Sequence, residues 1–266
     1  MSSSQTTPKH VVDMEDLRKV AQSVYARNAE LVKLDKMKDE FVALASHELR
    51  TPLTIVKNYL WLALHEKDEP LGSNTTKYID IAAETVDRLM FLVEDILTIS
   101  RIENGRVTLA KEDVDMVPFV RGLVESYQVK AQEKQIRLSF ESSVDSQLVT
   151  FDKNRFTQVV INILGNALKF TPVGGAVRVS VDIEDGAICM VRVSDTGPGV
   201  ASDKQASLFT KFGKIDDSYA NLPNVNGTGL GLYISKEIMH LHEGTLTAES
   251  VWGKGSTFIA SLPITK

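Results

Sequence analysis

The sequence contains a single cysteine, Cys189, among its 266 residues. One cysteine rules out a disulfide within the chain and fits a reducing compartment. Cys189 lies in the apolar run AICMVRV, so we expect it to be a buried strand residue rather than a reactive thiol.

Long apolar runs are also missing. No stretch approaches the roughly 18 consecutive apolar residues that a membrane-spanning helix requires, so we expect no membrane span in this chain. The first ten residues, MSSSQTTPKH, are polar and lack the apolar core of a signal peptide. We interpret residues 1–16 as a disordered tail.

Basic residues are not in excess either. The chain has 30 lysines and arginines against 35 aspartates and glutamates, a formal net charge of -5. Because a nucleic-acid-binding surface is typically basic, we expect no nucleic-acid partner. Hydrophobic residues at 43% and charged residues at 24% indicate an ordinary globular protein. The length fits one large or two ordinary domains.

A heptad of apolar residues runs from Leu17 to Phe41. It predicts a signalling helix over residues 17–40 that forms a weak two-stranded coiled coil. A surface helix packed on its own chain would show the same pattern, and both interpretations stay open.

Two more amphipathic helices are expected before residue 105. The first contains His47 and continues to about Leu64. The charged stretch 66–74 after it, with its proline and glycine, is expected to be a turn. A second helix follows and ends at Asn104-Gly105. One such hairpin buries its apolar stripes only partly, so two copies should pair into a four-helix bundle.

The stretch FVALASHELRTPLTIVK, residues 41–57, centres on His47 and Glu48. Its apolar residues recur at helical spacing, and His47 falls off that stripe, toward solvent or a partner. Pro52 removes one helical hydrogen bond and should bend the helix about a turn past His47. A histidine beside a carboxylate on such a face is placed for nucleophilic work. An ordinary surface histidine on a bundle helix is the alternative.

After Gly105 the pattern changes to short strands alternating with helices, which predicts an α+β sandwich over residues 105–266. Glu184-Asp185-Gly186 is a hairpin signal between two strands. Helices are expected at about 115–133, 153–170 and 228–242, and strands at VTLA, IRLSFES, LVTF, AVRVSVDI, AICMVRVSD, GTLTAES and STFIASL.

Three motifs in this second part indicate nucleotide chemistry. The first is NILGNALKFT, in which Asn162 and Asn166 project from one helix face, followed by Lys169 and Phe170. Amide oxygens suit magnesium bridged to phosphates, and a lysine can pair with phosphate. Two asparagines that cap or face solvent are the alternative.

The second motif, DTGPGV, follows a strand directly. Asp195 ends that strand, and its carboxylate can accept a hydrogen bond from an amino group such as that of adenine. Gly197 and Gly199 allow a close approach of a ligand. A plain turn would also explain a Gly-Pro-Gly sequence.

The third motif, GTGLGL over residues 227–232, lies at a helix start. Backbone N–H groups at a helix N-terminus form a cradle for anions. The polar stretch 213–226 before it reads as a mobile flap over a nucleotide. Helix packing alone is the other explanation for the glycines.

Together these motifs resemble the sensor histidine kinases of two-component systems, over roughly residues 36–262. Five boxes of that family occur in its order. They are the phosphoacceptor box (His47, Glu48, Leu49, Arg50, Thr51, Pro52), the asparagine box (Asn162, Asn166, Lys169, Phe170), the first glycine box (Asp195, Gly197, Gly199), the phenylalanine box (Phe209, Phe212) and the second glycine box (Gly227, Thr228, Gly229, Leu230, Gly231).

The resemblance implies a dimerisation and phosphotransfer domain over 41–104 and an ATP-binding domain over 105–266, of the type shared with gyrase and heat-shock chaperone ATPases. The family moves the γ-phosphoryl group of ATP to a histidine and then to an aspartate on the receiver domain of a response regulator. The implied partners are a second copy of the chain, that regulator and an upstream sensor domain or protein. The implied location is the cytoplasm, where the chain is a soluble kinase or the cytoplasmic part of a membrane-bound sensor.

The resemblance also assigns roles to individual residues. His47 is the phosphoacceptor, and Glu48 orients it or takes a proton. Magnesium binds Asn166 with Asn162 nearby, while Lys169 and Lys214 contact phosphates. Asp195 accepts a hydrogen bond from the adenine amino group. Thr51, four residues after His47, helps to place a water that dephosphorylates the regulator.

The sequence departs from the family around the phenylalanine box. Thr210 and Gly213 stand where relatives often carry an acidic residue and an aromatic one, a departure that concerns the packing of the flap and not ATP binding. Three rival functions remain: an ATP-binding dimeric scaffold without phosphotransfer, an ATP hydrolase, and a kinase of serine or threonine.

Overall fold

The computed structural model describes residues 18, 22–23, 25, 27–28, 49–63, 65, 73–213 and 228–264. By its internal contacts the chain divides into two units, Met1–Thr54 and Ile55–Lys266. The expected tail and most of the expected flap lie outside the described residues. So do four predicted site residues: His47, Glu48, Lys214 and Gly227.

The helical part contains two neighbouring helices. Residues 49–63 are helical, and helix α2 spans Ser73–Glu103. The rings of Tyr59 and Tyr78 lie 5.8 Å apart and join the two helices, as expected for a hairpin. Gly105 adopts a φ of +63° after α2, and the Arg106 N–H donates to the Arg101 carbonyl over 2.9 Å. This is the glycine-dependent helix end that the sequence predicted.

The sheet-containing part follows α2. Its five-stranded sheet has the order β2-β4-β5-β7-β6, in which β2 and β4 are parallel and the other neighbours are antiparallel. A separate pair, β1 with β3, is antiparallel. The strands span Glu112–Asp115 (β1), Arg137–Ser142 (β2), Leu148–Phe151 (β3), Ala176–Glu184 (β4), Ile188–Asp195 (β5), Thr245–Val251 (β6) and Gly255–Pro263 (β7).

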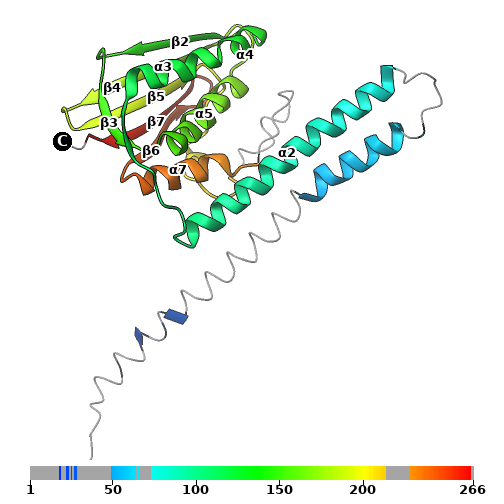
Figure 1. The fold of residues 1–266 in the computed structure, drawn as a ribbon, viewed down its shortest axis with the longest axis horizontal. Helices are drawn as coiled ribbons and strands as arrows, with labels where there is room; N and C mark the ends of the chain where they lie inside the picture. The colour runs from blue at the N-terminus through cyan, green and yellow to red at the C-terminus, as the bar shows by residue number, and fades with distance from the viewer. Residues whose placement is uncertain are drawn as a thin grey trace, which may run out of the picture. The chain divides into compact units, whose positions relative to one another are not determined.

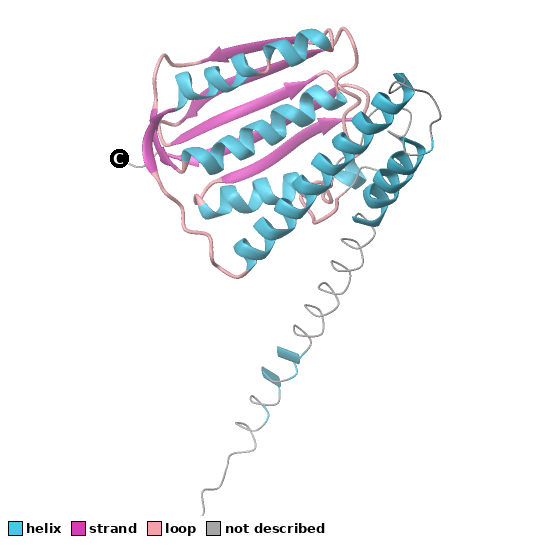
Figure 2. Ribbon diagram, turned by 45° about the vertical axis from the view of Figure 1, so that its right-hand side comes forward, coloured by secondary structure: helices cyan, strands magenta, loops and turns pink. Residues whose placement is uncertain are grey.

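Helices cover one face of this sheet (Figure 2). They are α3 (Met116–Ser126), α4 (Gln128–Glu133), α5 (Lys153–Phe170) and α7 (Gly231–Leu241), with a short α6 (Ser202–Gln205) between β5 and α7. Apolar side chains of α5 and α7 such as Ile163, Leu164 and Ile234 are at most 1% exposed, and they pack against the sheet. Cys189 on β5 is buried, as predicted, and burial raises the pKa of its thiol to about 12. The predicted helix-and-sheet architecture is confirmed (Figure 1).

The hairpin between β4 and β5 forms where the sequence predicted it. Asp185 and Gly186 both have positive φ, +49° and +66°, which suits the central residues of a tight hairpin turn. The Ala187 N–H donates to the Glu184 carbonyl over 3.0 Å and closes the turn.

Three predicted boundaries were wrong. VTLA is not a strand: residues 107–110 have no regular structure, and the Ala110 N–H donates to the Asp152 carboxylate over 2.9 Å. The helix expected at 115–133 is two helices, α3 and α4, which meet at Tyr127. The last long helix begins at Gly231 rather than at Thr228.

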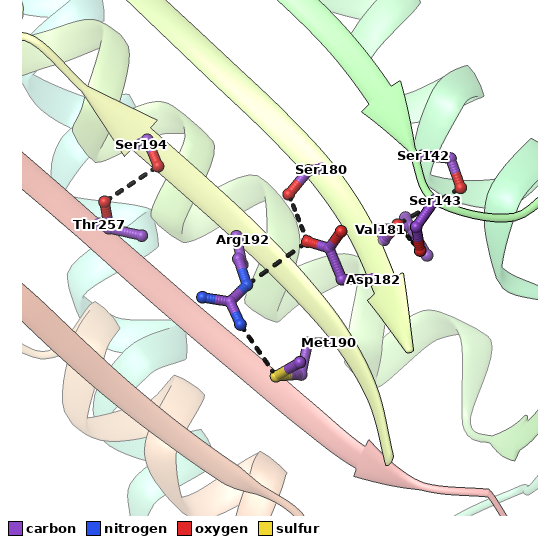
Figure 3. Close-up of polar contacts among 9 residues, drawn as sticks. All are labelled: Ser142, Ser143, Ser180, Val181, Asp182, Met190, Arg192, Ser194 and Thr257. Atoms are coloured by element: carbon purple, nitrogen blue, oxygen red, sulfur yellow. Dashed lines mark hydrogen bonds and ion pairs between the residues drawn. The ribbon is translucent and has the colours of Figure 1, made fainter. Parts of the chain in front are cut away.

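The other face of the sheet carries polar side chains that alternate with the buried valines of β4 and β5 (Figure 3). Arg192 and Asp182 form an ion pair across the two strands, with 3.4 Å between Nε and Oδ2. Ser180 donates to the same Asp182 oxygen over 2.8 Å, and Ser194 pairs with Thr257 over 2.9 Å. The polar side chains of this face therefore bind one another, within β4 and across neighbouring strands.

Within the described residues, no helix is both long and apolar enough to cross a membrane.

Candidate functional site

A pocket opens where α5, the end of β5, the start of α7 and the start of β7 meet. It brings together three motifs that are distant in sequence, since Asn166 and Phe170 come from α5, Asp195 and Gly199 from the β5 end, and Leu232 from α7. The complete lining is Asn166, Phe170, Asp195, Pro198, Gly199, Val200, Leu208, Leu232, Ser256 and Phe258. A mostly apolar wall with a few polar groups suits a flat heterocycle such as a purine.

Asp195 is the acidic group of this pocket. Its Oδ1 accepts a hydrogen bond from the Gly197 N–H over 2.8 Å. Burial raises the pKa of Asp195 above its ordinary value, while backbone hydrogen bonds from Gly197 and Ser256 oppose that shift. A carboxyl group held in this way at a strand end can accept a further hydrogen bond from an amino group.

The two glycines after Asp195 are required by close contacts. A Cβ on Gly199 would lie 2.1 Å from the Val251 carbonyl oxygen, and the residue has a φ of +69°. A Cβ on Gly197 would lie 2.7 Å from the Asp195 carboxylate oxygen Oδ1. Larger residues here would displace the acid or the strand beside it.

The asparagine box lies on α5, and its members point in different directions. Asn166 and Phe170 line the pocket, and the Lys169 ammonium lies 5.0 Å from the centre of the Phe170 ring. Asn162, one turn earlier, donates from Nδ2 to the Ser235 hydroxyl on α7 over 2.9 Å. The described residues contain no group of three or more His, Cys, Asp or Glu side chains suited to a metal.

The second glycine box forms the N-terminus of α7. The Leu230 N–H donates to Thr228 Oγ1 over 3.2 Å, and Leu230 itself is fully buried. Gly229 has a φ of +70°, and a Cβ there would lie 2.9 Å from the Phe212 backbone. The N-cap residue of α7, Leu230, makes no side-chain cap hydrogen bond, and the backbone N–H groups of the helix start at Gly231 suit an anion.

The phenylalanine box folds against the sheet. The Phe209 ring meets the Phe258 ring edge-on, with centroids 6.5 Å apart, and the Lys236 ammonium lies 5.9 Å from the Phe209 ring. A side chain at position 213 would clash, because a Cβ on Gly213 would lie 2.1 Å from the Ser207 carbonyl oxygen. The Thr210 hydroxyl donates to the same carbonyl over 2.7 Å. These two departures from the family pattern are thus accommodated up to residue 213.

Contacts with α2 were not predicted. Glu103 near the end of α2 forms an ion pair with Lys211 and accepts a hydrogen bond from the Tyr233 hydroxyl over 3.4 Å. Asp95 accepts a hydrogen bond from Thr228 over 3.1 Å. Leu92 and Ile99 of α2 are at most 4% exposed. No sequence pattern indicates these pairs, because their partners are more than a hundred residues apart.

Thr51 is the one member of the predicted catalytic set that the structure describes. It is helical and exposed. It belongs to the first unit, whereas the pocket belongs to the second.

Two family models match the chain. Residues 37–105 match the His Kinase A (phospho-acceptor) domain. Residues 151–266 match the histidine kinase-, DNA gyrase B-, and HSP90-like ATPase.

Individual proteins agree with these matches. The circadian input-output histidine kinase CikA of Synechococcus elongatus is 36% identical over 85% of this chain. The structure of full-length ShkA in complex with AMPPNP has a TM-score of 0.63 and 26% identity over 84% of this chain and 46% of that chain. The histidine kinase ThkA, in complex with the response regulator protein TrrA, shares the fold with a TM-score of 0.68 and 23% identity over 97% of this chain and 68% of that chain.

The chain spans only part of the curated relatives that it matches. It covers 30% of the length of CikA and 17% of a hybrid signal transduction histidine kinase of Dictyostelium discoideum.

Proposed function

The chain belongs to the sensor histidine kinases of two-component systems, and from this membership we propose that it phosphorylates itself on His47 with ATP. In this reaction an imidazole nitrogen of His47 attacks the γ-phosphorus, the new N–P bond replaces the bond to the bridging oxygen, and ADP leaves. Glu48 orients the ring or takes the proton from its other nitrogen. The phosphoryl group then passes to an aspartate of a response regulator.

One observation carries the nucleotide part of this proposal. Asn166, Phe170 and Asp195, from two of the predicted boxes, line a single pocket with Leu232 of α7. The glycine-rich start of α7, at Gly231, supplies a cradle for the phosphates. Asp195 at the strand end is the proposed acceptor for the adenine amino group.

We assign the contact with magnesium to Asn166. Because the described residues offer no acidic or histidine cluster for a metal, an ion here would take its ligands from amide oxygen, phosphate oxygens and water, as magnesium does. The ion offsets charge on the transferring phosphoryl group when bound. Asn162 stays a prediction as a second contact, and Lys169 and Lys214 stay predictions as phosphate contacts.

A second copy of the chain is the proposed partner of α2. Apolar residues at heptad spacing are exposed along this helix: Ile79, Val86 and Val93 form one row, and Met90 and Leu97 form the next. Alternating steps of three and four residues are the pattern of a helix-pairing seam. We propose that two hairpins pair along this seam into a four-helix bundle.

Further roles follow from family membership. Thr51, which is exposed on a helix and follows His47 by four residues in the sequence, is proposed to support dephosphorylation of the regulator. A sensor domain or protein upstream of residue 41 is proposed to control the balance between the kinase and the phosphatase activity. Because ATP and response regulators are cytoplasmic, we place the reaction in the cytoplasm.

Labelling with γ-labelled ATP and magnesium tests the proposal. The wild-type chain should gain an acid-labile, alkali-stable label that is lost in His47→Ala and in Asp195→Ala. Asp182→Ala, which removes a carboxylate from the open face of the sheet, should keep the label.

The rival functions predict different results. ATP binding without any label would support the scaffold. Steady hydrolysis without a phosphoprotein would support the hydrolase, and a label that survives acid would support a kinase of serine or threonine.

A further inference from the structure

The two asparagines of α5 are used differently. Asn166 lines the nucleotide pocket, whereas the Asn162 amide lies against α7 and is not among the described residues that line the pocket. The sequence groups them because they are four residues apart on one helix. Their surroundings separate them.

Asn162 is held by two residues of α7 that are one turn apart. Its Nδ2 donates to the Ser235 Oγ over 2.9 Å. A Cβ added at Gly231 would lie 2.4 Å from Asn162 Oδ1 and 3.0 Å from Cγ. The amide therefore fits against the bare backbone of Gly231 while Ser235 fixes its nitrogen end.

Ser235 is well placed to hold this side chain. It is 1% exposed and sits among apolar residues of α7 such as Ile234 and Ile238, which are equally buried. A hydroxyl in such surroundings requires a hydrogen-bond partner, and Asn162 provides one. The bond joins the middle of α5 to the first turns of α7.

We infer that Ser235 is a positioning residue for nucleotide binding: through Asn162 it fixes the start of α7 against α5. This inference rests on the proposed function. The start of α7 carries the proposed phosphate cradle, and α5 carries Asn166, so the bond sets the distance between these two parts of the nucleotide site. This role replaces the predicted contact with magnesium: Asn162 acts by holding α7 and not as a magnesium ligand.

The test measures the dissociation constant of a fluorescent ATP analogue, with magnesium and with EDTA. Ser235→Ala and Asn162→Ala should each weaken binding about fivefold, the effect of one net hydrogen bond. The loss should be the same in both buffers, and the double variant should be no weaker than the weaker single variant. Autophosphorylation should show the loss in KM for ATP more than in kcat.

Matched variants separate positioning from general damage. Ser235→Thr and Ser235→Val have the same shape, but only threonine keeps the hydroxyl, so threonine should bind nucleotide more tightly while both melt at similar temperatures. Ser180→Ala, which removes a hydroxyl from the open face, should leave binding unchanged.

Other outcomes would overturn the inference. If Asn162→Ala weakened binding only in magnesium, Asn162 would be a metal ligand. If Ser235→Ala bound like wild type, or the two losses simply added, no coupling would exist. A wild-type chain that bound no nucleotide in either buffer would overturn the proposed function, and the positioning role with it.

Discussion

Thr228, at the beginning of the glycine-rich segment, donates a hydrogen bond to Asp95 of α2, with 3.1 Å between Oγ1 and Oδ2. The same hydroxyl oxygen accepts from the Leu230 N–H. Lys211 pairs with Glu103 of the same helix. The described residues on both sides of segment 214–227 are therefore attached to α2, so changes in α2 should be felt at the nucleotide site.

Replacing Asp95 tests this attachment. Burial raises the pKa of Asp95, the hydrogen bond from Thr228 opposes the shift, and the charge of Glu94 adds to it. Asp95→Asn keeps an acceptor for Thr228 without a charge, so it should retain or raise the melting temperature at pH 7. Asp95→Ala should cost about 1 kcal/mol of stability through the lost hydrogen bond.

The pH dependence of Asp95 has a defined sign. Because the folded chain holds this proton more tightly than the unfolded chain, the contribution of Asp95 to stability should grow as the pH falls through its raised pKa. The difference in melting temperature between Asp95→Asn and wild type should therefore shrink toward acid pH. A constant difference from pH 8 to pH 4 would contradict the raised pKa.

His242 predicts a second dependence on pH, with the opposite sign. It is 3% exposed, its Nε2 accepts from the Asp152 N–H over 3.0 Å, and its Nδ1 bonds to the Ile238 carbonyl over 2.8 Å. Burial lowers the pKa of His242; the Ile238 carbonyl and Asp152 oppose this, and Lys111 adds to it. A protonated ring would lose the bond to the Asp152 N–H, because it has no acceptor left.

The sign follows from linkage. Since the unfolded chain binds this proton more tightly, stability is complete above the ordinary pKa of 6.5 and decreases as the pH falls from there through the lowered pKa. Thermal melting between pH 8 and pH 5 should show a drop that is smaller in His242→Gln. His240→Gln, which replaces an exposed histidine in the last turn of α7, is the matched control. Equal slopes in wild type and His242→Gln would refute the assignment.

The sequence predicted those elements whose cause is local. Helix α5 matched the predicted range because Asp152 caps it, accepting from the Arg155 N–H, and its apolar residues keep helical spacing. The hairpin at Asp185-Gly186 is equally local. The strand expected at VTLA did not form, and Ala110 instead contacts Asp152, a residue 42 positions away that no local pattern indicates.

In the site, too, features with a local cause could be predicted and contacts between distant segments could not. Asn166, Phe170 and Asp195, each predicted from a short motif with its own chemistry, line one pocket, and their contacts with a nucleotide stay a prediction. The pair Asn162 and Ser235 spans 73 residues, and nothing in either motif indicates the partner. The roles of His47 and Glu48 stay predictions.

The seam on α2 predicts the oligomeric state. Met90 is 66% exposed and lies in the heptad row with Leu97. Met90→Glu should place two charges opposite each other in the paired hairpins and convert the dimer to a monomer in light scattering. Glu84→Lys changes charge off the seam and should stay dimeric. A Met90→Glu chain that remained dimeric would place the interface elsewhere.

Gly199 offers the most direct test of the pocket wall. It has a φ of +69°, and a Cβ would lie 2.1 Å from the Val251 carbonyl oxygen, while Gly186 has nearly the same φ, +66°, with nothing within 4 Å. Gly186→Ala should therefore cost only the left-handed conformation, about 1–2 kcal/mol in urea unfolding. Gly199→Ala carries that cost and a backbone clash in addition, so it should lose more stability and weaken binding of the ATP analogue, which Gly186→Ala should leave unchanged. Equal effects of the two variants on stability and binding would mean that the backbone at Val251 can move away from the added Cβ at no energetic cost. Gly199 would then be needed for its backbone conformation alone.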